Sequence, residues 1–183
     1  ASTDLHWLET DGVDDGMATG NIDFTGTDKV SVFAGLRKLS DAASGILCEL
    51  GTDVATVNNS FGLFAPSVSG ANSYRFGSRG TAAVFVGSRV FAAAPNTSVI
   101  TGVGNILGDI ASLRTNRVIR EVATNDQGAG NYGNYPLYLF RRGGSIAPFN
   151  GWFYGLAITG RLTTDAETVA TERYLATKSG VTL

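Results

Sequence analysis

Apolar residues in this chain recur at every second position over short runs, which is the period of a half-buried β-strand. The clearest run is residues 29–36, in which Val30, Val32, Ala34 and Leu36 share one face. Further strand signals fall at residues 21–24, 46–50, 61–64, 74–76, 82–86 and 98–103. Turn-forming residues separate these runs at intervals of about 8–15 residues. The pattern therefore predicts an all-β chain of about ten short strands, folded as a sandwich or a barrel.

One hairpin can be placed from its turn. Residues 109–114 and 117–122 flank Thr115-Asn116, and Asn tolerates the left-handed dihedral angles that a two-residue turn needs. This turn would bring Arg114 near Arg117.

A helix is predicted at the end of the chain. Thr164 is a good N-cap residue, and Glu167 three positions later completes a capping box. Gly180 can end the helix in the left-handed conformation. The apolar stripe that packs on a sheet is predicted to consist of Ala166, Val169, Ala170 and Tyr174.

Composition narrows the class of protein. A chain of 183 residues suffices for one domain, predicted to span residues 1–183. The net charge of −2 gives no electrostatic basis for nucleic-acid binding. No apolar run approaches the roughly 20 residues that a membrane helix needs, so membrane insertion is not expected. Cys48 and His6 are single in the sequence, which excludes an intrachain disulfide and a Cys/His zinc site. Cys48 is interpreted as a small core residue.

A set of turn and strand motifs extends over nearly the whole chain. It consists of Asp11-Gly12-Val13-Asp14-Asp15 and residues 29–38, 126–139, 141–144 and 148–159. Together these motifs resemble those of phage virion proteins with a concanavalin A-like, laminin-G-like domain of the lectin and glucanase fold. The resemblance implies a two-sheet antiparallel jelly-roll β-sandwich with a short C-terminal α-helix.

The resemblance also implies a location in a virion, as a tail, fibre or head-appendage module. Two functions follow as alternatives. The module binds carbohydrate or a host-surface glycan, or it is an architectural subunit that contacts other virion proteins without binding sugar. A homo-oligomer is expected in either case.

The acidic residues do not indicate an enzyme. Glucanases of the resembled fold carry an E-x-D-x-x-E pattern, because one carboxyl group protonates the leaving oxygen while a second attacks or activates water. This chain lacks that pattern, and its glutamates are scattered. Glu49 and Glu121 are interpreted as residues of solvated strand faces.

The Gly-rich loop at residues 125–136 is the candidate sugar site. Amide and carboxylate groups bind vicinal hydroxyls, and aromatic faces cover C–H patches of a sugar. The candidate ligand-binding residues are Asn125, Asp126, Gln127, Asn131, Tyr132, Asn134, Tyr135 and Arg141. A subunit contact, or a surface loop whose tyrosines pack on the sandwich, are the alternatives. The doublet Arg141-Arg142 suits acidic sugars or phosphate, with a solvated strand end as its alternative. Trp7, Trp152 and Tyr154 are interpreted as core or edge packing.

The acidic turn near the start is a candidate calcium site. Asp11, Asp14 and Asp15 supply the hard oxygen ligands that Ca²⁺ prefers, with Asp109 and Asp126 as further ligands if folding brings them near. Their spacing does not match an EF-hand. The alternative is turn chemistry, in which Asp side chains accept hydrogen bonds from nearby backbone N–H groups.

Overall fold

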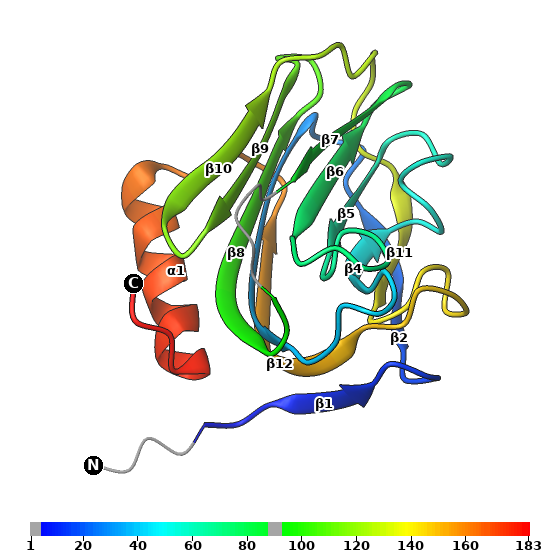
Figure 1. The fold of residues 1–183 in the computed structure, drawn as a ribbon. Coiled ribbons are helices and arrows are strands. Elements are labelled where there is room, and N and C mark those ends of the chain that lie inside the picture. Colours follow the sequence, from blue (N-terminus) through cyan, green and yellow to red (C-terminus); the bar gives the residue numbers. More distant parts are fainter. Residues whose placement is uncertain (1–4, 88–92) are drawn as a thin grey trace.

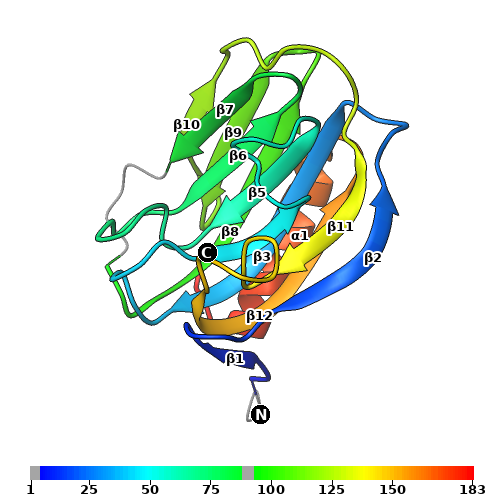
Figure 2. The ribbon, with the colours of Figure 1, turned by 90° about the vertical axis from the view of Figure 1, so that its right-hand side faces the viewer.

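The computed structural model describes residues 5–87 and 93–183, and in this part of the chain two antiparallel six-stranded sheets lie face to face (Figure 1). Sheet A has the order β1-β12-β3-β8-β9-β10 and sheet B the order β2-β11-β4-β5-β6-β7. The strands of sheet A are β1 (Leu8–Asp11), β3 (Lys29–Lys38), β8 (Asn96–Asn105), β9 (Ile110–Thr115), β10 (Val118–Ala123) and β12 (Asn150–Thr159). The strands of sheet B are β2 (Met17–Asp23), β4 (Ile46–Leu50), β5 (Ser60–Phe64), β6 (Arg75–Arg79), β7 (Ala83–Gly87) and β11 (Asn134–Leu139). The predicted all-β sandwich is confirmed, with β1 and β2 as edge strands (Figure 2).

The main core lies between the sheets, because each strand turns alternate side chains inward. The predicted inner face of β3 is confirmed, since its four apolar members are fully buried. Cys48 is also buried in this core. Sheet B contributes the core residues Leu47, Leu50, Phe61, Leu63, Phe76, Val84, Val86 and Leu137.

The predicted hairpin exists, but its turn lies one residue further along the chain. Thr115 pairs with Val118, and the two turn residues are Asn116 and Arg117, with φ of 49° and 67°. Arg114 and Arg117 are therefore not a strand pair, since Arg114 pairs with Ile119. The expected proximity is nevertheless confirmed, because Arg114 Nη2 donates to the Arg117 carbonyl at 3.2 Å. Asn116 is held by a tertiary contact, because its Oδ1 accepts a hydrogen bond from the Val99 N–H of β8 at 2.8 Å.

Helix α1 (Asp165–Ser179) has the predicted ends. The Thr164 side chain accepts a hydrogen bond from the Glu167 N–H, and the Glu167 carboxylate accepts one from the Thr164 N–H. Gly180 adopts the left-handed conformation and ends the helix. In the described part of the chain, no helix is both long and apolar enough to cross a membrane.

The predicted buried face of α1 is wrong. Tyr174 is 62% exposed, whereas the buried helix residues are Thr168, Glu172, Leu175, Ala176 and Ser179. Helix α1 lies on the outer side of sheet A (Figure 1). There Leu175 and Ala176 contact Phe33 and Val99. The prediction failed because three of the five buried helix residues, Thr168, Glu172 and Ser179, are polar.

A buried ion pair fastens the helix to the sheet. The Glu172 carboxylate accepts hydrogen bonds from Arg114 Nε at 2.9 Å and Arg114 Nη2 at 3.2 Å. The Thr101 hydroxyl donates a third hydrogen bond to it at 2.9 Å. Glu172 is therefore a satisfied polar residue at the helix–sheet interface, which hydropathy does not distinguish from a solvated one.

Candidate functional site

The predicted sugar loop at residues 125–136 turns two of its candidate residues into the protein. Tyr132 is 1% exposed, packs edge-on against Phe61, and its hydroxyl lies 2.6 Å from the Ser78 hydroxyl. Gln127 is fully buried, and its side-chain amide donates to the Asn105 carbonyl. Neither side chain is accessible to a sugar, because the loop crosses from sheet A to sheet B and these residues seal that end of the core.

The other polar residues of this loop mostly support its own conformation. The Asn131 amide donates to the Thr25 carbonyl at 2.6 Å, and Asp126 accepts from the Gly128 N–H at 2.6 Å. Asn125 and Asn134 are exposed, and Tyr135 is half-buried against the core. Tyr132 therefore packs on the sandwich, as the alternative of a plain surface loop predicts.

The acidic turn at residues 11–15 shows the hydrogen bonds of ordinary turn chemistry, which was the alternative to a calcium site. Asp11 Oδ1 accepts from the Val13 N–H at 2.7 Å, and Asp15 Oδ2 accepts from the Asp11 N–H at 2.9 Å. Among the described residues, no group of three or more potential metal ligands converges, so the structure does not bring Asp14 to these two carboxylates as a site. Asp109 lies elsewhere, where its carboxylate accepts from the Gln127 N–H. Calcium binding by this turn therefore stays a prediction, which a calorimetric titration with Ca²⁺ would test.

The two residues of the arginine doublet have different roles. Arg141 spans two turns, because its guanidinium donates to the Asp14 carbonyl at 3.0 Å and to the Ser145 carbonyl at 2.6 Å. Arg142 instead reaches over the outer face of sheet B. Its Nε donates to Glu49 Oε2 at 3.1 Å, and its Nη2 donates to Glu49 Oε1 at 3.2 Å. Nη2 also lies 3.3 Å from the Asp53 carboxylate.

Glu49 is not on a solvated strand face, contrary to the sequence interpretation. Its side chain is fully buried under residues 51–59, and it accepts a further hydrogen bond from the Val54 N–H at 2.8 Å. Glu121 is half-buried, and it accepts from the Gly87 N–H at 2.6 Å. The causes differ, because Glu49 of sheet B is covered on the outer side and donated to by Val54, whereas Glu121 of sheet A bonds to Gly87 of the opposing sheet B.

A second arginine lies beside this pair. Arg75, at the start of β6, places its guanidinium carbon 3.7 Å from the ring centroid of Phe85 and 5.7 Å from that of Phe64. Arg142 lies 5.6 Å from the same Phe64 ring. Phe64 and Phe85 belong to a small cluster on the outer face of sheet B, separate from the main core. We call Arg75, Arg142, Glu49 and Asp53 the arginine cluster.

The charges of the arginine cluster are unevenly paired. Arg142 has two carboxylate partners, whereas within the described residues Arg75 has neither an ion pair nor a hydrogen bond through its side chain. Burial lowers the pKa of the Arg75 guanidinium, and the positive charge of Arg142 lowers it further. Burial also raises the pKa of the Glu49 carboxyl, against the opposite effects of the Val54 N–H and Arg142. The cluster thus holds a half-buried cation without an anion.

Sequence reasoning found Arg142 but missed the rest of the cluster. Its members come from β4, β6 and two loops, and nothing in their spacing indicates that they meet. Phe64 and Phe85, at alternating strand positions, were the available signal of an outward aromatic surface.

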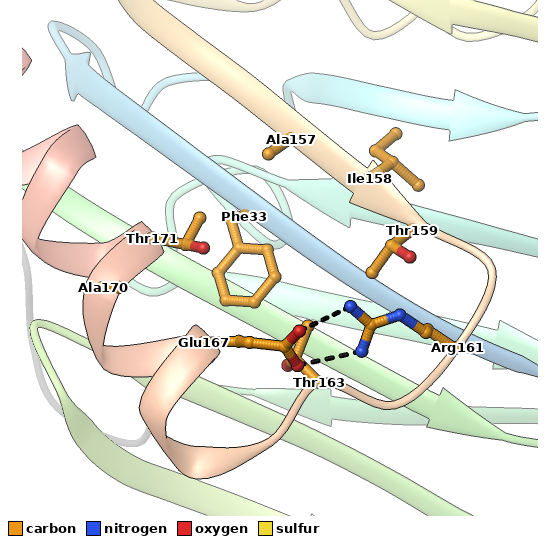
Figure 3. A pocket seen from close by; sticks show the side chains of 9 residues that line it. All are labelled: Phe33, Ala157, Ile158, Thr159, Arg161, Thr163, Glu167, Ala170 and Thr171. Atoms are coloured by element: carbon orange, nitrogen blue, oxygen red, sulfur yellow. Dashed lines mark hydrogen bonds and ion pairs between the residues drawn. The ribbon is translucent and has the colours of Figure 1, made fainter.

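The described part of the chain also has a groove of about 340 Å³ between α1 and β12. It is lined mainly by Phe33, Ala157, Ile158, Ala170 and Thr171. Figure 3 shows Arg161 and Glu167 facing each other at its rim, with nitrogen–oxygen distances of 2.6 and 2.9 Å. Hydrogen bonds from Arg161 and Thr164 lower the pKa of Glu167 to about 2. Because these charged groups are occupied by each other and by the helix cap, the groove offers mainly apolar surface.

Comparison with known proteins places the fold. No model of a known protein family matches the chain, and no curated protein matches its sequence. Solved structures do match. The CBM40 carbohydrate-binding module of the Ruminococcus gnavus IT-sialidase, bound to α2,3-sialyllactose, is 15% identical with a TM-score of 0.60, over 90% of this chain and 97% of the module.

Two further structures extend the comparison. A heptameric SAP-like pentraxin from Limulus polyphemus is 8% identical with a TM-score of 0.68, over 98% of this chain and 84% of the pentraxin. The NanB sialidase of Streptococcus pneumoniae has a TM-score of 0.61 at 12% identity, and the chain corresponds to 27% of its length. At these identities the likeness establishes the fold alone, which is a concanavalin A-like jelly roll.

Proposed function

We propose that this domain is a non-catalytic carbohydrate-binding module and that the arginine cluster on the outer face of sheet B binds an acidic sugar. One observation carries the proposal. Arg75 is half-buried, lies against Phe85 and Phe64, and has no opposite charge among the described residues. A desolvated cation of this kind is stabilised by an anionic ligand, and a guanidinium binds a carboxylate through two parallel hydrogen bonds.

The aromatic residues beside Arg75 suit the rest of a sugar. Phe85 is half-buried on the outer face of β7, so part of its ring is available to C–H groups of a pyranose. Two similar structures support this choice of ligand class, since the CBM40 module was solved with α2,3- and with α2,6-sialyllactose. Sialic acid has a carboxylate that could pair with the Arg75 guanidinium.

The same geometry disfavours hydrolysis as the role of the cluster. Glu49 and Asp53 both approach Arg142, so the fold holds a nearby pair of carboxylates that no sequence pattern indicates. Both Glu49 oxygens, however, accept hydrogen bonds from within the protein, and the side chain is fully buried. A glycosidase acid must contact the leaving oxygen, and this carboxyl has no open side from which to do so.

The experiment is a calorimetric titration with α2,3-sialyllactose, using lactose as the neutral comparison. We expect binding of sialyllactose and not of lactose at this site, and we expect Arg75→Ala to weaken it at least about tenfold, the effect of losing a charge-assisted pair. Arg75→Lys keeps the charge but not the planar fork, so it should restore only part of the affinity.

Arg173→Ala is the matched control, because it removes one arginine from an exposed position of α1, on the opposite sheet. Affinity should stay unchanged in this variant. Equal weakening by Arg75→Ala and Arg173→Ala would mean that net charge alone attracts the sugar, and binding unaffected by Arg75→Ala would refute the site. Turnover of a sialoside that is lost in Glu49→Gln would refute the non-catalytic role.

The alternative is an architectural subunit that makes protein contacts. It is favoured by the edge strand β10, whose Val118, Ile119 and Val122 are 49–58% exposed. Exposed apolar side chains on an edge strand are suited to pairing with another chain. Sedimentation equilibrium would show a stable oligomer that dissociates in Ile119→Lys if this surface is an interface. The virion location implied by the sequence resemblance is likewise a proposal, and mass spectrometry of purified particles would test it.

A further inference from the structure

The outer face of sheet A carries a group of aromatic side chains beside helix α1. Phe153 of β12 and Leu36 of β3 point into the core, so their neighbours Trp152 and Arg37, which are paired across the two strands, point outward. Trp7, just before β1, stacks on Trp152, with ring centroids 4.7 Å apart and an interplanar angle of 23°. The ring faces of the two indoles are therefore held nearly parallel.

Two more side chains fix this arrangement, which we call the tryptophan stack. The Arg37 guanidinium carbon lies 4.9 Å from the Trp152 ring centroid. Tyr154 meets Trp7 edge-on, with ring centroids 6.2 Å apart. Trp152 and Tyr154 are half-buried, but Trp7 is 41% exposed. The outermost member of the stack thus presents an indole surface that is supported from below by a second indole.

Folding stability alone does not account for the tryptophan stack. Trp7 contributes to none of the buried clusters of the sandwich. Trp152 Nε1 and Arg37 Nε are buried, and neither has a hydrogen-bond partner in the part of the chain that the structure describes. Buried donors without partners disfavour the folded state, so these two side chains stabilise the fold less than their burial alone would suggest.

We propose that the tryptophan stack is a second carbohydrate site, which binds the C–H face of a neutral pyranose. A flat, supported and partly exposed aromatic ring is the surface that such a sugar face covers. Polar groups for its hydroxyls are at hand, because Glu9 pairs with Trp152 across β1 and β12 and is exposed, as is His6. This site lies on the opposite sheet from the arginine cluster, and it does not depend on the proposal made for that cluster.

A sugar fits this surface better than a protein does. Within the stack, Trp7 is exposed whereas Trp152 and Tyr154 are half-buried, so the aromatic surface on offer is mainly one indole, whereas a stable protein interface buries roughly 800 Å² on each partner. A single pyranose ring matches the size of an indole.

The protein carries its own reporter for this test, because its sequence contains two tryptophans and both are in the stack. Tryptophan fluorescence is titrated with cellohexaose, xylohexaose, mannohexaose and chitohexaose, and the exciton signal of the stacked indoles is followed by circular dichroism. We expect a saturable change with at least one of these neutral oligosaccharides. Trp7→Ala should weaken its binding, measured by calorimetry, about five- to tenfold, and Trp7→Phe should weaken it less.

Tyr174→Ala is the matched control, since Tyr174 is an aromatic residue 62% exposed on α1, outside the stack. Arg75→Ala should keep the full response to the neutral sugars, so failure of one proposed site is distinguishable from failure of the other. Lack of binding to all four probes would overturn the proposal. It would also be overturned by self-association that Trp7→Ala abolishes, because the stack would then be a protein interface.

Discussion

The outer face of each sheet carries a buried glutamate bound by two nitrogens of an arginine, but the surroundings of the two pairs differ. On sheet A, Glu172 of α1 binds Arg114, and the third hydrogen bond to its carboxylate comes from a neutral hydroxyl. On sheet B, Glu49 binds Arg142, which also lies near the Asp53 carboxylate. A second arginine, Arg75, lies beside Phe64, the aromatic neighbour of Arg142.

The two sites differ in how their charges are paired. The sheet A pair has one positive and one negative charge, is covered by the helix and needs nothing more. The arginine cluster has the same pair at its base, but Asp53 adds a second carboxylate near Arg142, and Arg75 adds a cation that makes no ion pair with any described residue. Under the proposed function, the Glu49–Arg142 pair stays intact and Arg75 supplies the charge for the ligand.

The largest expected effect concerns the pair on sheet A. Glu172→Ala leaves Arg114 partly buried without its partner and removes the acceptor of Thr101, and we expect a loss of about 3 kcal/mol in the free energy of unfolding. Glu49→Ala should cost less, because Asp53 remains near Arg142. Urea denaturation of both variants measures the difference. Equal losses would show that the two pairs are energetically equivalent and that Asp53 does not compensate.

An intermediate effect concerns the charge of Glu49. Glu49→Gln removes a negative charge from the arginine cluster, and we expect it to raise the affinity for sialyllactose about two- to fivefold. Because burial raises the pKa of Glu49, the wild-type affinity should also be higher at an acidic than at a neutral pH, whereas the Gln variant should respond less. Calorimetric titrations at both pH values test this, and identical pH profiles would refute a role of Glu49 ionisation.

The same raised pKa has a consequence for stability. The folded state binds the Glu49 proton more tightly than the unfolded chain does, so this group favours folding at acidic pH, and its contribution diminishes as the pH rises through the folded-state pKa. Relative to Glu49→Gln, the wild-type protein should therefore gain stability on acidification from neutral pH. The difference between the two urea midpoints isolates this group from the other acids.

The smallest expected effect concerns the helix cap. Thr164→Ala removes the hydroxyl that accepts the Glu167 N–H, and we expect a loss of about 1 kcal/mol in the free energy of unfolding. Affinity for sialyllactose should not change, because α1 lies on sheet A and the arginine cluster lies on sheet B. Thr164→Ser, which keeps the acceptor, is the control. A change in sugar affinity with Thr164→Ala alone would show that the two outer faces are coupled.

The sequence revealed what depends on local chemistry. The alternation in β3 and the caps at Thr164 and Gly180 were predictable, because each follows from a few neighbouring residues. The hairpin turn was misplaced by one residue, since Asn116 and Arg117 both take positive φ and a contact with β8 decides the position.

Features that depend on distant contacts were not predictable in the same way. From the sequence alone, Glu172 is indistinguishable from a solvated helix residue, because its partner Arg114 is distant in the chain. Tyr132 is likewise indistinguishable from a ligand-binding residue, because Phe61 and Ser78 enclose it only in the folded protein. Of the candidate site, the Arg141-Arg142 doublet was visible, but the partners of Arg142 come from segments more than 80 residues earlier, beyond the reach of any local pattern.

The face-to-face arrangement of the sheets has a consequence for how the domain would meet a polysaccharide surface. The arginine cluster and the tryptophan stack look in opposite directions, so one glycan chain of ordinary length cannot lie across both. The domain could instead bind two glycan chains at once, one on each face. Binding of the first chain would then raise the local concentration of the second, so that two weak contacts reinforce each other. The domain would then cross-link neighbouring polysaccharide chains.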